Sequence, residues 1–132
     1  MQKFQILETS MILRNELYSI QDTKCGDAEF CYSLNLNVES IIYKAHFPGN
    51  PITPGACMMQ MLQEITEDAV GRKLVLQKLS NVKFLMPLSP LEASNVDVRC
   101  KYAETDGLLK VQATFASGDV VYAKMSMSYI NN

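Results

Sequence analysis

Residues 46–60 read HFPGNPITPGACMMQ, and this stretch separates two kinds of sequence pattern. Before it, residues 29–36 alternate apolar and polar side chains with the period of two that is typical of a β-strand. After it, Thr53 is expected to be a helix N-cap and Pro54 the first helical residue, because a proline at that position loses no hydrogen bond. The helix is predicted to run to Val70 and to end at Gly71.

The first two turns of this helix, residues 56–62, are apolar on almost every side, so we expect other structure to wrap around it. Most of the remaining chain has strand patterns. We therefore expect one α+β domain over residues 1–132, in which about five or six antiparallel strands fold around the helix and leave sheet edges for a dimer to cover. Before the motif we expect a short helical turn at 9–16, two strands in 18–37 around a turn at 25–27, and an extended piece at 41–47. After the helix we expect strands in 73–87 and 120–130, and between them a hairpin in 95–115 with its turn at 105–107.

Composition excludes several classes of function. The chain has 132 residues, of which 48% are hydrophobic and 20% charged, and its formal net charge is -2. A sequence pI near 5.3 without a basic block argues against nucleic-acid binding. No apolar run is long enough to span a membrane and no signal peptide is recognisable, so we expect a soluble, cytoplasmic protein.

Cofactors are not expected either. The four cysteines (Cys25, Cys31, Cys57 and Cys100) are widely spaced, and the chain has one histidine. These are few ligands for a tetrahedral zinc site, which needs four close together. Free thiols in a reducing compartment are the simpler interpretation. A Cys57 nucleophile is rejected because an apolar helix raises the pKa of a thiol. No phosphate loop or dinucleotide fingerprint is present.

The motif HFPGNPITPG at residues 46–55, followed by a helix, resembles the signature of the 3-hydroxyacyl-[acyl-carrier-protein] dehydratases of fatty-acid synthesis. The resemblance extends through the order of elements and includes VKFLMPLSP at residues 82–90. It implies a hotdog fold, in which an antiparallel sheet wraps around one long helix. It also implies a homodimer with active sites at the subunit interface, and a 3-hydroxyacyl chain on acyl carrier protein as substrate.

Dehydration of such a thioester needs a base for the α-proton, an acid for the departing hydroxyl and donors for the thioester oxygen. The resemblance gives His46 the role of base, and the ordinary pKa of histidine, about 6.5, suits it. It gives Gly55 the role of a backbone donor, since the first turn of a helix has unpaired N–H groups. Phe47, Pro54 and Met59 are expected to contact the substrate. The alternative for His46 is a histidine that caps a turn at the end of a strand.

The sequence departs from the family at Gln60, where the family has a carboxylate. An amide does not exchange a proton at neutral pH, although it can bind a hydroxyl or a water. Glu64 lies one turn further on nearly the same helix face. It could supply the acid through Gln60 or a water, or it could belong to a solvated stripe. That stripe would comprise Gln60, Gln63, Glu64, Glu67 and Asp68, although Gln60, among methionines, is expected to point into the site.

Three functions are compatible with these patterns. The first is dehydration of a 3-hydroxyacyl thioester on acyl carrier protein, and the second is thioester hydrolysis, which needs a positioned water. The third is a non-catalytic subunit that binds acyl groups or completes a heterodimer. An acidic carrier protein would contact the scattered cations Lys44, Arg72, Lys73, Lys78 and Lys83.

Overall fold

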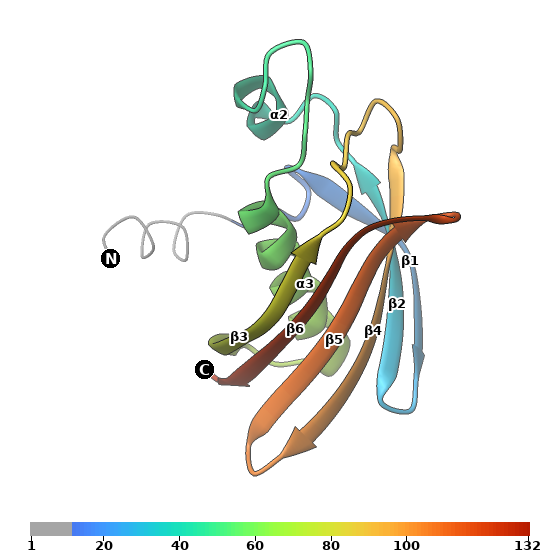
Figure 1. Ribbon diagram of the computed structural model, residues 1–132. Coiled ribbons are helices and arrows are strands. Elements are labelled where there is room, and N and C mark those ends of the chain that lie inside the picture. Colours follow the sequence, from blue (N-terminus) through green and yellow to red (C-terminus); the bar gives the residue numbers. More distant parts are fainter. Residues whose placement is uncertain (1–11) are drawn as a thin grey trace.

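A computed structural model describes residues 12–132, which form one antiparallel sheet and two helices (Figure 1). The six strands lie in the order β1-β2-β4-β5-β6-β3, so β1 and β3 are the edges. The predicted α+β arrangement of antiparallel strands around one long helix is confirmed. The strands are β1 (Tyr18–Gly26), β2 (Glu29–Leu36), β3 (Leu74–Phe84), β4 (Asn95–Thr105), β5 (Leu108–Ser117) and β6 (Val120–Asn131), and the helices are α2 (Ile41–Ala45) and α3 (Gly55–Val70).

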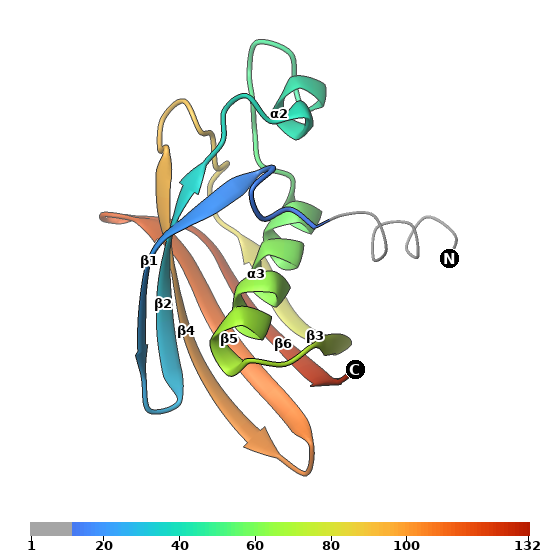
Figure 2. The same ribbon diagram turned by 180° about the vertical axis from the view of Figure 1, so that it is seen from behind.

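Helix α3 lies across one face of the sheet, with α2 beyond its first turn (Figures 1 and 2). Its buried residues Met58, Met61, Leu62, Ile65 and Thr66 belong to the face that meets the sheet. The strands present alternate residues to the same core, which in β6 are Ala123, Met125, Met127 and Tyr129. A period of 3.6 in the helix and of two in the strands therefore builds one core. No helix in residues 12–132 has the length and apolar character needed to cross a membrane.

The two ends of α3 were predicted with different success. Gly71 ends the helix as expected, with a φ of 73° that glycine adopts readily, and its N–H donates to the Glu67 carbonyl at 2.9 Å. The N-cap, however, is Pro54 and not Thr53. Thr53 is 4% exposed, and its hydroxyl shares a hydrogen bond of 2.7 Å with the Tyr43 hydroxyl. The threonine therefore ties the loop to α2 instead of capping α3.

The prediction that residues 41–47 are extended is wrong, because most of them form α2. Ser40 caps this short helix, its Oγ accepting from the Ile42 N–H at 3.2 Å. Of the helical residues only Tyr43 is buried, whereas Ile41 is 71% exposed. The β-branched isoleucines favour a strand, but the Ser40 cap and the burial of Tyr43 stabilise one helical turn instead.

The hairpin turns follow from residues that tolerate positive φ. Asp106 and Gly107, with φ of 55° and 78°, join β4 to β5 where the sequence predicted the turn. The first hairpin turns at residues 27–28, later than predicted, and Gly26 stays paired with Glu29. The turn predicted at 9–16 begins outside the described residues. Its described part is bonded by the Leu17 N–H donating to the Leu13 carbonyl at 2.8 Å.

Candidate active site

His46 lies at the C-terminal end of α2 with its backbone fixed and its side chain exposed. Its N–H donates to the Ile42 carbonyl at 2.9 Å, and its own carbonyl accepts from the Ile52 N–H at 2.8 Å. The imidazole makes no hydrogen bond to any residue from 12 onward. The Phe47 ring stands edge-on to it with centroids 5.8 Å apart, and the peptide bond between the two residues is cis. The imidazole nitrogens are therefore available to a bound molecule.

The loop after His46 is closed by its own backbone. The Phe47 N–H donates to the Asn50 carbonyl at 3.2 Å, and the Asn50 N–H returns a bond to Phe47 at 2.8 Å. Gly49 has a φ of 78°, in the region that favours glycine. Together with the prolines of the motif, these bonds hold the histidine on a stiff loop before α3.

The first turn of α3 presents unpaired backbone donors beside this loop. The Pro54 carbonyl accepts from the N–H groups of Cys57 and Met58, at 3.0 and 3.1 Å. Within residues 12–132 the N–H groups of Gly55 and Ala56 have no hydrogen-bond acceptor. The positive end of the helix dipole lies here, so the position favours an oxygen that gains negative charge.

Gly55 is in close contact with an aromatic ring that the sequence did not assign to the site. A Cβ atom on Gly55 would lie 2.6 Å from Cζ of Phe84, which is much shorter than an ordinary carbon contact. Phe84 ends β3 and is 52% exposed. Glycine at this position thus allows the ring to lie on the helix start. The segment 82–90 is part of the resemblance, but nothing in the sequence indicates this contact.

Glu64 holds the chain that precedes β1. Its Oε1 accepts from the Arg14 N–H at 2.9 Å and from the Tyr18 hydroxyl at 2.7 Å. Its Oε2 accepts from the Leu13 N–H at 2.8 Å and from the Gln60 Nε2 at 3.0 Å. The i and i+4 side chains therefore meet, as their spacing indicates. All four partners donate, and none of them belongs to the loop at residues 46–54.

The other polar residues of α3 are also bonded to flanking segments. The Gln63 Nε2 donates to the Leu74 carbonyl at 3.0 Å, and Glu67 accepts from the Leu74 N–H at 2.9 Å. Asp68 accepts from Arg14 at 3.1 Å and from the Tyr32 hydroxyl. The stripe is therefore not simply a solvated face. It fastens α3 to residues on both sides of it.

The other residues that the sequence analysis considered for the site or for metal binding lie on α3 or are not grouped. Met59 and Cys57 are half-buried on α3 and pack against the core. Burial raises the pKa of the Cys57 thiol, and the charge of Glu64 raises it further. Over residues 12–132, no three His, Cys, Asp or Glu side chains are grouped as metal ligands. No hydrogen bond joins His46 to Gly55, Gln60 or Glu64 in the described chain.

An antiparallel sheet curved around one long helix, with a histidine loop before that helix, defines a hotdog-fold protein, and solved structures confirm this fold. A chain of the dehydratase heterocomplex ApeI:P from Xenorhabdus doucetiae matches with a TM-score of 0.71 at 16% identity, over 86% of this chain and 98% of that chain. A hypothetical thioesterase with coenzyme A from Streptococcus pneumoniae matches with a TM-score of 0.65 at 10% identity, over 100% and 96% of the two chains.

The chain belongs to the ApeI-like family, whose sequence model, described as ApeI dehydratase, matches residues 21–124. It is also similar to the 3-hydroxyacyl-[acyl-carrier-protein] dehydratase FabZ of Fusobacterium nucleatum, with 23% identity over 101 residues, 73% of this chain and 71% of that protein. The FabZ of Caulobacter vibrioides is 22% identical over 98 residues, 67% of this chain and 61% of that protein. These matches confirm the resemblance to a dehydratase family that the motif indicated.

Proposed function

We propose that this protein removes water from a 3-hydroxyacyl thioester carried by acyl carrier protein and yields the trans-2-enoyl thioester, in the synthesis of fatty acids or related acyl chains. The observation that carries the proposal is the exposed imidazole of His46 on a stiff loop directly before a helix start with unpaired N–H groups. The names of the related dehydratases support the same reaction class.

In the proposed reaction His46 removes the α-proton, and the electron pair of that C–H bond forms the double bond. The carbon–oxygen bond of the 3-hydroxyl group breaks, and the hydroxyl leaves as water after it gains a proton. The thioester oxygen becomes more negative in the transition state, where the N–H groups of Gly55 and Ala56 are suitable donors. Phe47, Pro54 and Met59 are proposed to contact the acyl chain.

The proton for the departing hydroxyl needs a source, because Gln60 cannot provide one. The proton that His46 has just taken balances the reaction, since the histidinium can return it to the hydroxyl. Gln60 would then orient that hydroxyl or a water by hydrogen bonding. Glu64 is better placed to hold Gln60, whose Nε2 lies 3.0 Å from its Oε2, than to act on the substrate.

We further propose that two copies of the chain form each site. β3 is an edge strand, and large apolar residues near its end are exposed, among them Phe84, Leu85 and Met86. Pairing of two β3 edges would cover them and enclose the acyl chain. A monomeric protein with full turnover would contradict this shared site.

The acidic carrier protein is proposed to dock beside the site. Among the expected contacts, Arg72 already binds Glu104 at 2.6 Å and Lys44 lies 3.9 Å from Glu39. Lys73, Lys78 and Lys83 are exposed and make no ion pair within residues 12–132. These three are therefore the freest of the five to contact a carrier, and their loss should mainly slow association.

Thioester hydrolysis is the second candidate, and Gln60 is the observation that favours it. Hydrolysis needs a water that attacks the carbonyl but no acid for a 3-hydroxyl group, so an amide suffices to position that water. A non-catalytic subunit that binds acyl chains or completes a heterodimer is the third.

One experiment separates the three. The protein is incubated with 3-hydroxyacyl, enoyl and saturated acyl thioesters of acyl carrier protein, and both enoyl formation and free thiol release are followed. Dehydration is supported by interconversion of the first two substrates without thiol release. Thiol release from all three would establish the hydrolase, whereas binding without either product would establish the non-catalytic subunit.

A further inference from the structure

The sheet face that points away from α3 is strongly basic. The Tyr32 hydroxyl bonds to Asp68 of α3, so the neighbouring Cys31 of β2 points to the opposite side. One cross-strand row through Cys31 spans all six strands. We call the face that contains this row the outer face. The row consists of Lys24, Cys31, Arg99, Thr114, Lys124 and Lys83.

Most cations of the chain lie on this outer face. Besides the four in that row, Lys101 lies in the next row, and Lys110 and Lys78 flank Ser128 in the row beyond. These seven are among twelve lysines and arginines in the sequence. Within the six strands, three carboxylates share the face, those of Asp22, Glu29 and Asp97. An excess of four positive charges thus lies on one face of a chain whose formal net charge is -2.

These charges are poorly compensated within the chain. Arg99 has an ion-pair partner, Asp97 at 4.0 Å, but the six lysines have none among residues 12–132. Lys83 and Lys124 are direct partners on neighbouring strands. Like charges in such a pair destabilise a sheet. The arrangement costs stability in the isolated chain, and a bound anionic surface would relieve that cost.

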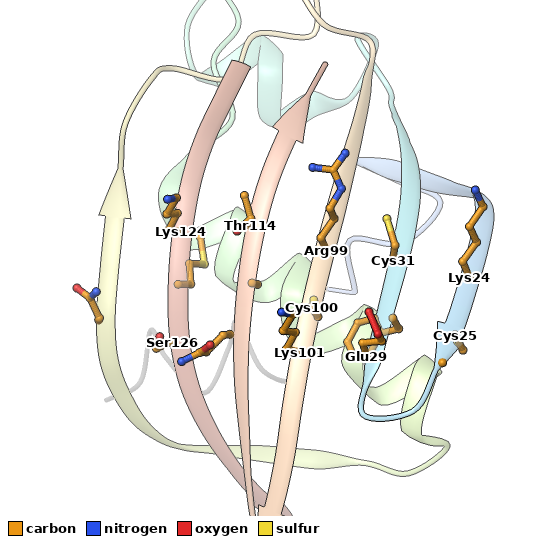
Figure 3. A pocket seen from close by; sticks show the side chains of 16 residues that line it. Lys24, Cys25, Glu29, Cys31, Arg99, Cys100, Lys101, Thr114, Lys124 and Ser126 are labelled. Atoms are coloured by element: carbon orange, nitrogen blue, oxygen red, sulfur yellow. The ribbon is translucent and has the colours of Figure 1, made fainter. Parts of the chain in front are cut away.

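Five of the six residues in that row also line an open groove of about 780 Å³. In Figure 3 the side chains of Lys24, Cys31, Arg99, Thr114 and Lys124 lie across it on five strands. Five strand spacings of about 4.8 Å make the row roughly 24 Å wide, and the three rows are roughly 14 Å deep. That extent suits a small protein interface of the transient kind. It is too open to enclose most of a small ligand.

We propose that the outer face binds the acidic, convex surface of a partner protein. Single-stranded nucleic acid is less suitable, because its binding sites use stacking aromatic side chains and none points outward from the six strands. A flat bilayer would not fit into a groove. Two outer faces would repel each other, which argues against pairing of identical copies through them. Lys78 and Lys83 are also among the proposed carrier contacts, but Arg99 and Lys124 are not. The test below uses Arg99 and Lys124, so the proposal does not depend on the reaction proposed above.

The test titrates the isotope-labelled full chain with an acidic helical peptide, with an oligonucleotide of the same charge and with phosphatidylserine vesicles. The expected result is salt-sensitive binding of the peptide, tighter than that of the other two probes, with amide shifts centred on Cys31, Arg99 and Thr114. The double variant Arg99→Glu, Lys124→Glu should weaken peptide binding at least about tenfold. The double variant Arg99→Lys, Lys124→Arg keeps the positive charge at both positions, and it should have little effect on peptide binding.

A stability measurement provides an independent readout. Lys124→Glu alone should raise the melting temperature, since it replaces the like-charge pair with Lys83 by an opposite-charge pair, and it should still weaken peptide binding. Equal weakening by both double variants, or shifts centred elsewhere, would overturn the proposal. Tighter binding of the oligonucleotide or the vesicles would also overturn it, and would assign the face to that partner instead.

Discussion

Replacing Glu64 by glutamine removes half of the acceptors that fasten the chain before β1 to α3. The wild-type carboxylate accepts four hydrogen bonds of 2.7 to 3.0 Å, two of them from backbone N–H groups. A glutamine keeps one acceptor oxygen and turns the other position into a donor. Two bonds are therefore lost, and the new amide N–H groups face existing donors.

The expected cost follows from the number and kind of these bonds. A hydrogen bond to a charged group contributes about 1.5–3 kcal/mol to stability. Glu64 is only half-buried, so the lower part of this range applies to each lost bond. We expect Glu64→Gln to lower the free energy of unfolding by about 3–4 kcal/mol, which corresponds to a melting temperature lower by roughly 10–15 °C.

Urea denaturation and thermal melting measure this directly. The control is Glu92→Gln, the same change at an exposed carboxylate without a side-chain hydrogen bond in residues 12–132, and it should stay within about 0.5 kcal/mol of wild type. Tyr18→Phe removes one of the four donors and should cost about 1.5 kcal/mol. If Glu64→Gln unfolds at the same urea concentration and temperature as the wild type, Glu64 does not hold this segment.

The same variant also tests the role of Glu64 in catalysis. At a temperature where the variant is folded, we expect turnover within about tenfold of wild type, because Glu64 acts through Gln60 and not on the substrate.

Three further results are expected. Gly55→Ala should lower turnover with little effect on the melting temperature, because its Cβ would lie 2.6 Å from the Phe84 ring, which is half exposed and can move. An additional Phe84→Ala substitution should recover part of the lost turnover. Wild-type kinetics in the Gly55→Ala variant would contradict the contact. Burial raises the pKa of Tyr43 to about 12. An unfolded tyrosine ionises near pH 10, so this group stabilises the fold below about pH 10, and the contribution is lost as the pH rises towards 12. Tyr43→Phe should cost about 1 kcal/mol at neutral pH through the lost bond to Thr53 and should lessen the alkaline loss in urea titrations; an unchanged alkaline profile would contradict this. Gln60→Glu should raise the rate of dehydration measured by enoyl formation, and a rate below that of the wild type would show that the pocket rejects the charge.

Local chemistry explains which elements the sequence could predict. The turn at Asp106 and Gly107 requires positive φ and lies between two alternating segments, so sequence alone identifies it. Gly71 ends α3 for a similar reason. The motif at residues 46–55 identified the fold and the family because its glycines and prolines constrain the backbone itself.

Contacts between distant residues explain what the sequence could not show. α2 was missed because its one buried residue, Tyr43, is held by Thr53 across a loop. The role of Glu64 was missed because its donors lie at residues 13–18, far away along the chain. Likewise, the cations of the outer face are scattered in sequence and meet only when the register of six strands is known. The proximity of Phe84 to Gly55 is of the same kind.

The most direct test of the proposed catalysis is His46→Ala, with dehydration of a 3-hydroxyacyl thioester on acyl carrier protein as the readout. The exposed imidazole makes no hydrogen bond in the described chain, so the variant should have the same melting temperature as the wild type. General acid–base catalysis typically contributes about a hundredfold to ten-thousandfold, and we expect a loss of turnover of that size. Full turnover by the folded His46→Ala variant would contradict it.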